Sequence, residues 1–128
     1  MTDALISAAL AARENAVAPF SKFRVGAALE DAEGRVHTGC NVENATYGLT
    51  MCAERVAVFK ALSEGIRKFS RIAIAADTGT LTPPCGSCRQ ILWEFCGDIQ
   101  ILLANPSGKT ETYRLKDLFP NPFDASYL

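Results

Sequence analysis

The most informative stretches of this sequence are Cys52-Ala53-Glu54-Arg55 and, further along the chain, Pro84-Cys85-Gly86-Ser87-Cys88. Together they supply three thiol side chains and one carboxylate. A structural zinc site normally closes with four protein ligands, whereas a catalytic site keeps three and leaves the fourth position for water. Three cysteines with a glutamate beside them therefore favour a hydrolytic zinc centre over a structural one.

The predicted ligands of one zinc ion per chain are Cys52, Cys85 and Cys88. Cys52 is expected in the first turn of one helix, and the other two in the first turn of the next, where a spacing of three places them on one face. Helix N-termini carry partial positive charge, which offsets the net negative charge of three thiolates on Zn²⁺. Arg55 is always protonated and is predicted to donate to the thiolate sulfurs from just outside the ligand set.

Glu54 is the predicted catalytic residue. Two positions after Cys52 on a helix, it points to a neighbouring side of the cylinder and can flank the metal without binding it. Cys-x-Glu followed by Pro-Cys-x-x-Cys matches the signature of zinc-dependent deaminases, in which the glutamate is the general acid–base. In that role it takes a proton from water and delivers it to a ring nitrogen and to the departing ammonia. A redox function for the Cys-x-x-Cys pair is disfavoured by the Pro84 before it and the Cys-x-Glu upstream.

Length and composition fit a single small domain spanning residues 1–128. The chain is 48% hydrophobic and 21% charged, as is ordinary for a soluble globular protein. Its net charge of −1 gives no long-range attraction for a nucleic acid polymer and leaves small molecules as the expected partners. No apolar run approaches the roughly 20 residues of a membrane span, and the N-terminus lacks the basic segment of a signal peptide. A cytoplasmic location is expected.

The five cysteines are an odd number, and a disulfide framework is not expected in a chain without a secretion signal. Three are assigned to the metal. The remaining two, Cys40 and Cys96, are interpreted as small buried hydrophobic residues.

Hydrophobic spacing predicts alternating helices and strands. A helix through Leu5–Ala12 follows the possible caps Thr2 and Asp3, and Thr50 is the expected cap of the helix over 51–64. The third predicted helix, over 85–95, places Cys88, Leu92 and Phe95 along one stripe. Strands are predicted over 23–29, 35–38, 71–76, 99–104 and 110–115, with turns at 31–34 and 105–108. This order predicts a three-layer α/β/α sandwich around a mixed five-stranded sheet.

The chain resembles a small cytidine deaminase of the zinc-dependent nucleoside deaminase superfamily over nearly its whole length. The zinc motifs alone specify only the superfamily, whereas Asn41-Val42-Glu43-Asn44 is specific to the nucleoside branch. One departure is Phe20, which stands where the family usually has Tyr. The segments that carry the resemblance are Ala18–Ala28, Gly39–Thr50, Cys52–Arg55 and Pro84–Gln90.

The resemblance implies deamination of cytidine and 2′-deoxycytidine in pyrimidine salvage, with Glu54 as the proton shuttle. It also implies that Asn41 and Glu43 bind the ribose 3′-hydroxyl and that Phe23 packs against the nucleoside. The small members of the family are homotetramers in which a phenylalanine near the C-terminus reaches a neighbour's active site. The other substrate-binding residues that it implies are Val42, Asn44, Ala45, Thr46, Tyr47, the Ala53 backbone and, from a neighbouring chain, Phe123.

Two alternatives remain open on the sequence. One is a related deaminase acting on another amidine-like ring, such as blasticidin S or a guanine-type base. It is disfavoured because Glu43 supplies a ribose contact that a free base would not use. The other is a non-catalytic zinc-binding module, which needs a fourth protein ligand. His37 is the only histidine available for it and lies far from the motifs in sequence.

Overall fold

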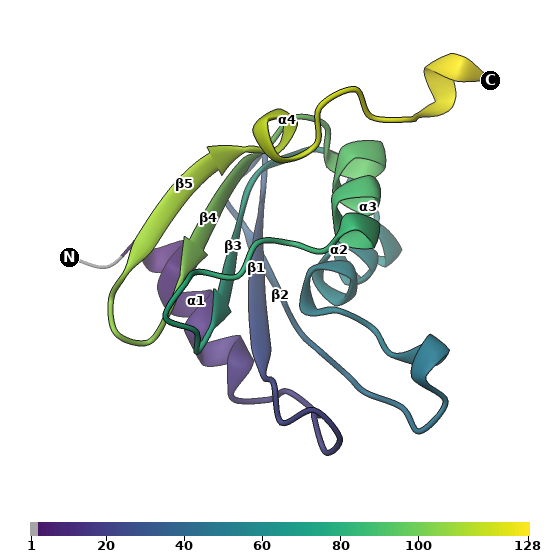
Figure 1. Ribbon diagram of the computed structural model, residues 1–128. Coiled ribbons are helices and arrows are strands. Elements are labelled where there is room, and N and C mark those ends of the chain that lie inside the picture. Colours follow the sequence, from purple (N-terminus) through teal and green to yellow (C-terminus); the bar gives the residue numbers. More distant parts are fainter. Residues whose placement is uncertain (1–2) are drawn as a thin grey trace.

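A mixed five-stranded sheet forms the centre of the computed structural model, which describes residues 3–128 (Figure 1). The spatial order of the strands is β2-β1-β3-β4-β5. Strands β3 and β4 run parallel, and every other neighbouring pair is antiparallel. The strands are β1 (Val25–Asp31), β2 (Val36–Cys40), β3 (Phe69–Ala76), β4 (Gln100–Ala104) and β5 (Thr110–Arg114).

Helices cover both faces of the sheet, which confirms the predicted α/β/α sandwich. Helix α1 (Ala4–Arg13) lies on one face, and α2 (Ala53–Ser63) and α3 (Gly86–Cys96) lie side by side on the other (Figure 1). Short helical turns follow at η1 (Tyr47–Leu49), α4 (Leu115–Leu118) and η2 (Ala125–Tyr127). None of the helices within residues 3–128 combines the length and apolar character needed to cross a membrane.

The central strands have two buried faces with different side-chain sizes. In β3, Ile72 and Ile74 point toward α2 and α3, whereas Ala73 and Ala75 point toward α1. Successive residues of a strand alternate between the two faces, so the run of apolar residues in β3 builds both hydrophobic layers. Larger residues thus fill the layer beneath α2 and α3, which is the layer that carries the metal motifs.

Glycine at position 39 sets how closely α2 approaches the sheet. A Cβ atom on Gly39 would lie 2.5 Å from the carbonyl oxygen of Ala53 and 2.6 Å from the amide nitrogen of Ala57. Both distances are shorter than real side chains allow, so only glycine fits here. The first turn of α2, with Cys52 and Glu54 at its start, is thereby held directly against β2.

Several local predictions are corrected by the structure. Thr50 does not cap α2: Cys52 is the N-cap residue, and the Thr50 hydroxyl instead accepts from the Asn44 amide at 3.1 Å. The strand predicted from Phe23 begins at Val25. Phe95 leaves the buried stripe of α3 and is 41% exposed.

The cap of α1 is Asp3, whose Oδ1 accepts from the Leu5 amide at 2.8 Å. The other predicted cap, Thr2, lies outside the described residues.

Candidate active site

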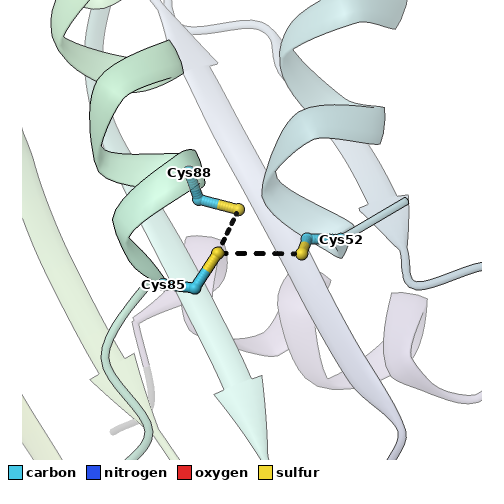
Figure 2. Close-up of side chains that lie close together, drawn as sticks. All are labelled: Cys52, Cys85 and Cys88. Atoms are coloured by element: carbon cyan, nitrogen blue, oxygen red, sulfur yellow. Dashed lines mark hydrogen bonds between the residues drawn. The ribbon is translucent and has the colours of Figure 1, made fainter. Parts of the chain in front are cut away.

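Three thiols meet where α2 and α3 begin. Cys52 is the N-cap residue of α2, Cys85 is the N-cap residue of α3, and Cys88 lies in the first turn of α3. The Sγ atoms of Cys52 and Cys85 are 3.9 Å apart, and those of Cys85 and Cys88 are 3.4 Å apart. Figure 2 shows the three side chains pointing toward one another across the gap between the two helices.

The thiol cluster fits a zinc ion. Tetrahedral Zn–S bonds of about 2.3 Å place sulfur atoms about 3.8 Å apart, and all three Sγ atoms lie within 4.8 Å of one another. No other group of metal-binding side chains occurs within residues 3–128. His37 is not part of the cluster, because its Nε2 lies 2.9 Å from Asp31 Oδ2 at the turn between β1 and β2. No fourth protein ligand therefore comes from histidine, and a structural zinc site is not favoured.

The two cysteines left over from the motifs stay outside the thiol cluster. Cys40 is half-buried at the end of β2, and Cys96 is half-buried at the end of α3. Burial raises the pKa of the Cys96 thiol to about 12. At neutral pH Cys96 therefore stays protonated and behaves as a small hydrophobic residue.

One positively charged side chain, Arg55, contacts the cluster. Arg55 Nη2 lies 3.3 Å from Cys52 Sγ, and Arg55 Nε is buried with no hydrogen-bond partner among residues 3–128. The neighbouring Cys88 thiol, and next the Arg55 guanidinium, lower the pKa of Cys52 to about 5. A thiolate is the form that binds metal, so Cys52 is in the metal-binding form at neutral pH, whereas the same Cys52–Cys88 contact raises the pKa of the Cys88 thiol.

Glu54 lies beside the thiols but does not belong to the cluster. Its side chain is buried, at 5% exposed. Burial, and then the negative charge at Cys52, raise the pKa of Glu54 to about 7. A carboxyl group with a pKa near the working pH can both accept and donate a proton, which is what general acid–base catalysis requires.

A cavity opens directly onto Glu54 and two of the thiols, Cys52 and Cys85. Phe23, Asn41 and Ala53, three of the residues predicted to bind substrate, line it. Its mostly apolar wall with a few polar groups is typical of a small-molecule site. The full lining is Phe23, Val25, Asn41, Thr50, Met51, Cys52, Ala53, Glu54, Ile74, Thr82, Pro83 and Cys85.

Glu43 lies next to this cavity rather than inside it. It lines an adjoining hollow with Phe20, Ser21 and Tyr47, and Thr50 borders both spaces. Of the two residues expected to bind the ribose 3′-hydroxyl, Asn41 thus lines the cavity and Glu43 lines the adjoining hollow. A ligand that contacts both side chains must extend across Thr50 from the cavity into the hollow.

Asn41 and Glu43 also hold the segment that carries Phe23. Asn41 Oδ1 accepts from the Val25 amide at 2.8 Å, and its Nδ2 donates to the Phe23 carbonyl at 2.7 Å. Glu43 Oε1 accepts from the Phe20 amide at 2.9 Å and the Ser21 amide at 3.1 Å, and its Oε2 accepts from the Ser21 hydroxyl. These bonds fix Phe23 at the cavity wall.

The rest of the predicted substrate loop lies outside the cavity lining. Val42 pairs with Val17 and Met51 through isolated β-bridges, and Asn44 Oδ1 accepts from the Thr46 amide at 2.8 Å. Tyr47 is exposed and packs edge-on against Phe20, with the ring centroids 6.1 Å apart. The remaining member, Ala45, is exposed between Asn44 and Thr46.

Phe123 does not reach the cavity of its own chain. The segment after α4 runs away from the body of the molecule (Figure 1). Its Phe123 carbonyl accepts from Gln90 Nε2 at 2.9 Å, and the Phe123 ring stacks on Tyr127. The ring itself is 58% exposed.

Several residues of the cavity carry no motif signal. Met51, Thr82 and Pro83 line it because they lie just before the two metal-binding helices. Proximity in sequence to Cys52 and Cys85 is the one signal that could have indicated them. Ile74 belongs to the hydrophobic core, and nothing in its sequence context distinguishes it from the other core residues of β3.

Three converging thiols, a buried carboxyl with a raised pKa and an adjoining apolar cavity define the class of zinc hydrolases. The family model for the cytidine and deoxycytidylate deaminase zinc-binding region matches residues 1–103. The chain belongs to this family of zinc-dependent enzymes, which confirms the resemblance noted in the sequence.

Individual relatives agree with the family assignment. The chain is 49% identical over 122 residues to a cytidine deaminase from Halalkalibacterium halodurans, covering 94% of this chain and 92% of that protein. It is 46% identical to a cytidine deaminase from Sporosarcina psychrophila, covering 96% and 93% of the two chains. The crystal structure of cytidine deaminase from Burkholderia pseudomallei superimposes with a TM-score of 0.92 at 48% identity, covering 96% of this chain and all of that one.

Proposed function

We propose that this chain catalyses the zinc-dependent hydrolytic deamination of cytidine and 2′-deoxycytidine, giving uridine or 2′-deoxyuridine and ammonia in cytoplasmic pyrimidine salvage. The observation that carries the proposal is the position of Glu54, which is buried beside three thiols and faces the cavity. The cytidine deaminases with which the chain shares nearly half of its residues support this choice of substrate class.

Cys52, Cys85 and Cys88 would hold the zinc ion, which when bound supplies a Lewis acid that makes a water molecule a stronger nucleophile. Glu54 accepts a proton from that water and delivers it to ring nitrogen N3 of the cytosine base. The water oxygen bonds to C4, and Glu54 then moves the remaining proton of the new C4 hydroxyl to the amino group. The C4–N bond breaks, ammonia leaves, and the C4 carbonyl of the uracil base forms. A pKa near 7 lets the same carboxyl group accept and donate in turn.

The nucleoside would be held by the cavity and the adjoining hollow together. Phe23 packs against the nucleoside, and the backbone at Ala53 lies near the base. A carboxylate accepts about four hydrogen bonds and an amide nitrogen donates two. Glu43 accepts three within the chain and Asn41 Nδ2 donates one, so each retains capacity for the ribose 3′-hydroxyl. The loop from Asn41 to Tyr47 would enclose the sugar.

The active assembly would be a homotetramer with shared sites. Phe123 lies outside its own cavity on a segment that projects from the body of the molecule. Phe59 and Phe95 form an edge-to-face pair on α2 and α3, and both are more than a third exposed. Exposed aromatic groups of this kind are typical of protein–protein contacts. In the assembly, Phe123 would complete the cavity of a neighbouring chain.

A substrate panel tests the proposal. The zinc-loaded protein is mixed separately with cytidine, 2′-deoxycytidine, cytosine, blasticidin S and guanine, and the loss of ultraviolet absorbance and the release of ammonia are recorded. We expect rapid turnover of both nucleosides. Turnover of blasticidin S or guanine without turnover of cytidine would instead identify a related deaminase, and bound zinc without turnover of any compound would identify a non-catalytic module.

A further inference from the structure

The loop from Asp77 to Pro84 connects the end of β3 to the metal-binding start of α3. Thr82 and Pro83, near its end, line the cavity. Because β3 and β4 are parallel, with Ala75 paired to Ala104, the two strands end side by side. The loop therefore begins next to the β4–β5 turn, which is distant from it in sequence.

Asn105 joins this turn to the loop. It is 6% exposed, and its Oδ1 accepts from the Lys109 amide at 3.0 Å, a bond that closes the turn. Its Nδ2 donates to the Thr78 carbonyl at 2.9 Å. Within the turn, the Asn105 side chain uses only its acceptor, Oδ1. Its donor, Nδ2, binds the loop instead.

The contact continues from Thr78 to the cavity. The hydroxyl oxygens of Thr78 and Thr82 lie 2.9 Å apart, and Thr82 borders the space in front of Glu54. A continuous path of two hydrogen bonds thus leads from the Asn105 amide to the cavity wall. The first bond fixes the backbone of the loop, and the second fixes the side chain that faces the substrate.

We propose that Asn105 is a positioning residue for substrate binding, which it serves by holding Thr78 and thereby Thr82 at the cavity wall. The inference rests on the proposed nucleoside site. It does not extend to the metal, because the far end of the loop has its own anchors: Leu81 is buried in the core, and Arg89 Nε donates to the Pro84 carbonyl at 2.8 Å. Loss of the Asn105 contact should therefore change substrate affinity and leave Cys85 in place.

Asn105→Asp is the sharpest test, because aspartate keeps the acceptor for Lys109 and replaces the donor to Thr78 with a carboxylate oxygen, which cannot bond to the Thr78 carbonyl. We expect KM for cytidine to rise about 2- to 13-fold, the range for one net hydrogen bond. We expect kcat to stay within about twofold, as for an interaction made equally in ground and transition states. Zinc content should stay at one per chain. Ser107→Ala is the matched control, since this exposed serine lies in the same turn and should leave KM unchanged.

Thr78→Val cuts the same path at its middle and should also raise KM. If one path is involved, the double variant Asn105→Asp/Thr78→Val should raise KM no more than the stronger single variant does. A lower melting temperature of Asn105→Asp with an unchanged KM would show a purely structural role and overturn the proposal. If Asn105→Asp does not fold, an unchanged KM in Thr78→Val would overturn it. Absence of cytidine turnover by the unaltered protein would instead refute the proposed function.

Discussion

Glu54 lies two residues after Cys52, yet Cys52 belongs to the metal-binding cluster and Glu54 does not. Glu54→Gln should keep the zinc and the fold, because glutamine has nearly the same shape and the thiols are untouched. It should lower kcat by at least about 10²- to 10⁴-fold, the usual contribution of general acid–base catalysis. Zinc analysis combined with steady-state kinetics measures both effects. Glu64→Gln, at the exposed end of the same helix, is the control, and near-normal kcat in Glu54→Gln would exclude Glu54 as the acid–base.

Glu43 is proposed to bind the sugar, and its carboxylate also accepts from the backbone amides of Phe20 and Ser21. We expect Glu43→Ala to lower kcat/KM for cytidine and deoxycytidine about 10- to 150-fold, as for loss of a hydrogen bond to a charged group. Turnover of free cytosine should change little, because the free base has no 3′-hydroxyl.

Ser21→Ala separates the two roles of Glu43. It removes the hydroxyl bond to Glu43 and the bond that the same hydroxyl accepts from the Phe23 amide at 3.0 Å, and it leaves the Glu43 carboxylate in place. Its effect should be small and equal for nucleosides and free base. If Glu43→Ala also lowers cytosine turnover to the same extent as cytidine turnover, the carboxylate supports the loop rather than binding the sugar.

At the scale of elements, the β1–β2 turn is closed by a buried carboxylate. The His37 ring, followed by the backbone amides of Arg35 and Glu33, holds the pKa of Asp31 at about 2, although burial acts in the opposite direction. An unfolded aspartate titrates near pH 3.9. The lowered pKa therefore adds stability above about pH 4, and that stability is lost as the pH falls toward about 2.

Asp31→Asn should accordingly lower the melting temperature at pH 7, with the difference from the unaltered protein shrinking between about pH 4 and pH 2. Thermal unfolding followed by circular dichroism over this range provides the measurement. Glu33→Gln, on the exposed part of the same turn, should show little effect. A difference between Asp31→Asn and the unaltered protein that stays constant down to pH 2 would contradict the assigned pKa.

The sequence predicts the three long helices and the five strands within a few residues of their observed ends, because apolar spacing reflects burial directly, whereas the short turns η1, α4 and η2 are not predicted. The sequence predicts the contacts of single side chains less well, because these depend on neighbours that are brought close only by the fold. Threonine is a residue type that often caps helices, but the Thr50 hydroxyl accepts from the Asn44 amide instead. Phe95 has the spacing of a core residue, yet it packs against Phe59 near the surface.

The candidate site likewise has a part that the sequence predicts and a part that it does not. Cysteine spacing predicts the thiol cluster, since the start of each helix fixes where its cysteines lie. The cavity wall also depends on tertiary contacts, such as the Gly39–Ala53 approach and the Asn105–Thr78 bond. These join segments far apart in the chain, and no periodic pattern in the sequence indicates them.

At the scale of the whole molecule, Phe123 is the residue that should show whether chains share their sites. Phe123→Ala should raise KM for cytidine with zinc content unchanged, because the ring would contact substrate in a neighbour rather than the metal. Mixing Phe123→Ala with Glu54→Gln should restore part of the activity, since the second variant supplies an intact Phe123. Activity should also fall on dilution below the assembly constant. Sedimentation as a monomer at full specific activity would refute both the tetramer and the shared site.

In the proposed function, three cysteines and Glu54 of one chain form a single hydrolytic zinc centre. The most direct measurement is a titration of metal-free protein with zinc, in which the rate of uridine formation from cytidine is followed. We predict that the rate rises linearly to one zinc per chain and then stays constant, and that Cys85→Ala neither binds zinc stably nor becomes active. Full turnover without zinc, or full zinc occupancy in Cys85→Ala, would refute this zinc centre.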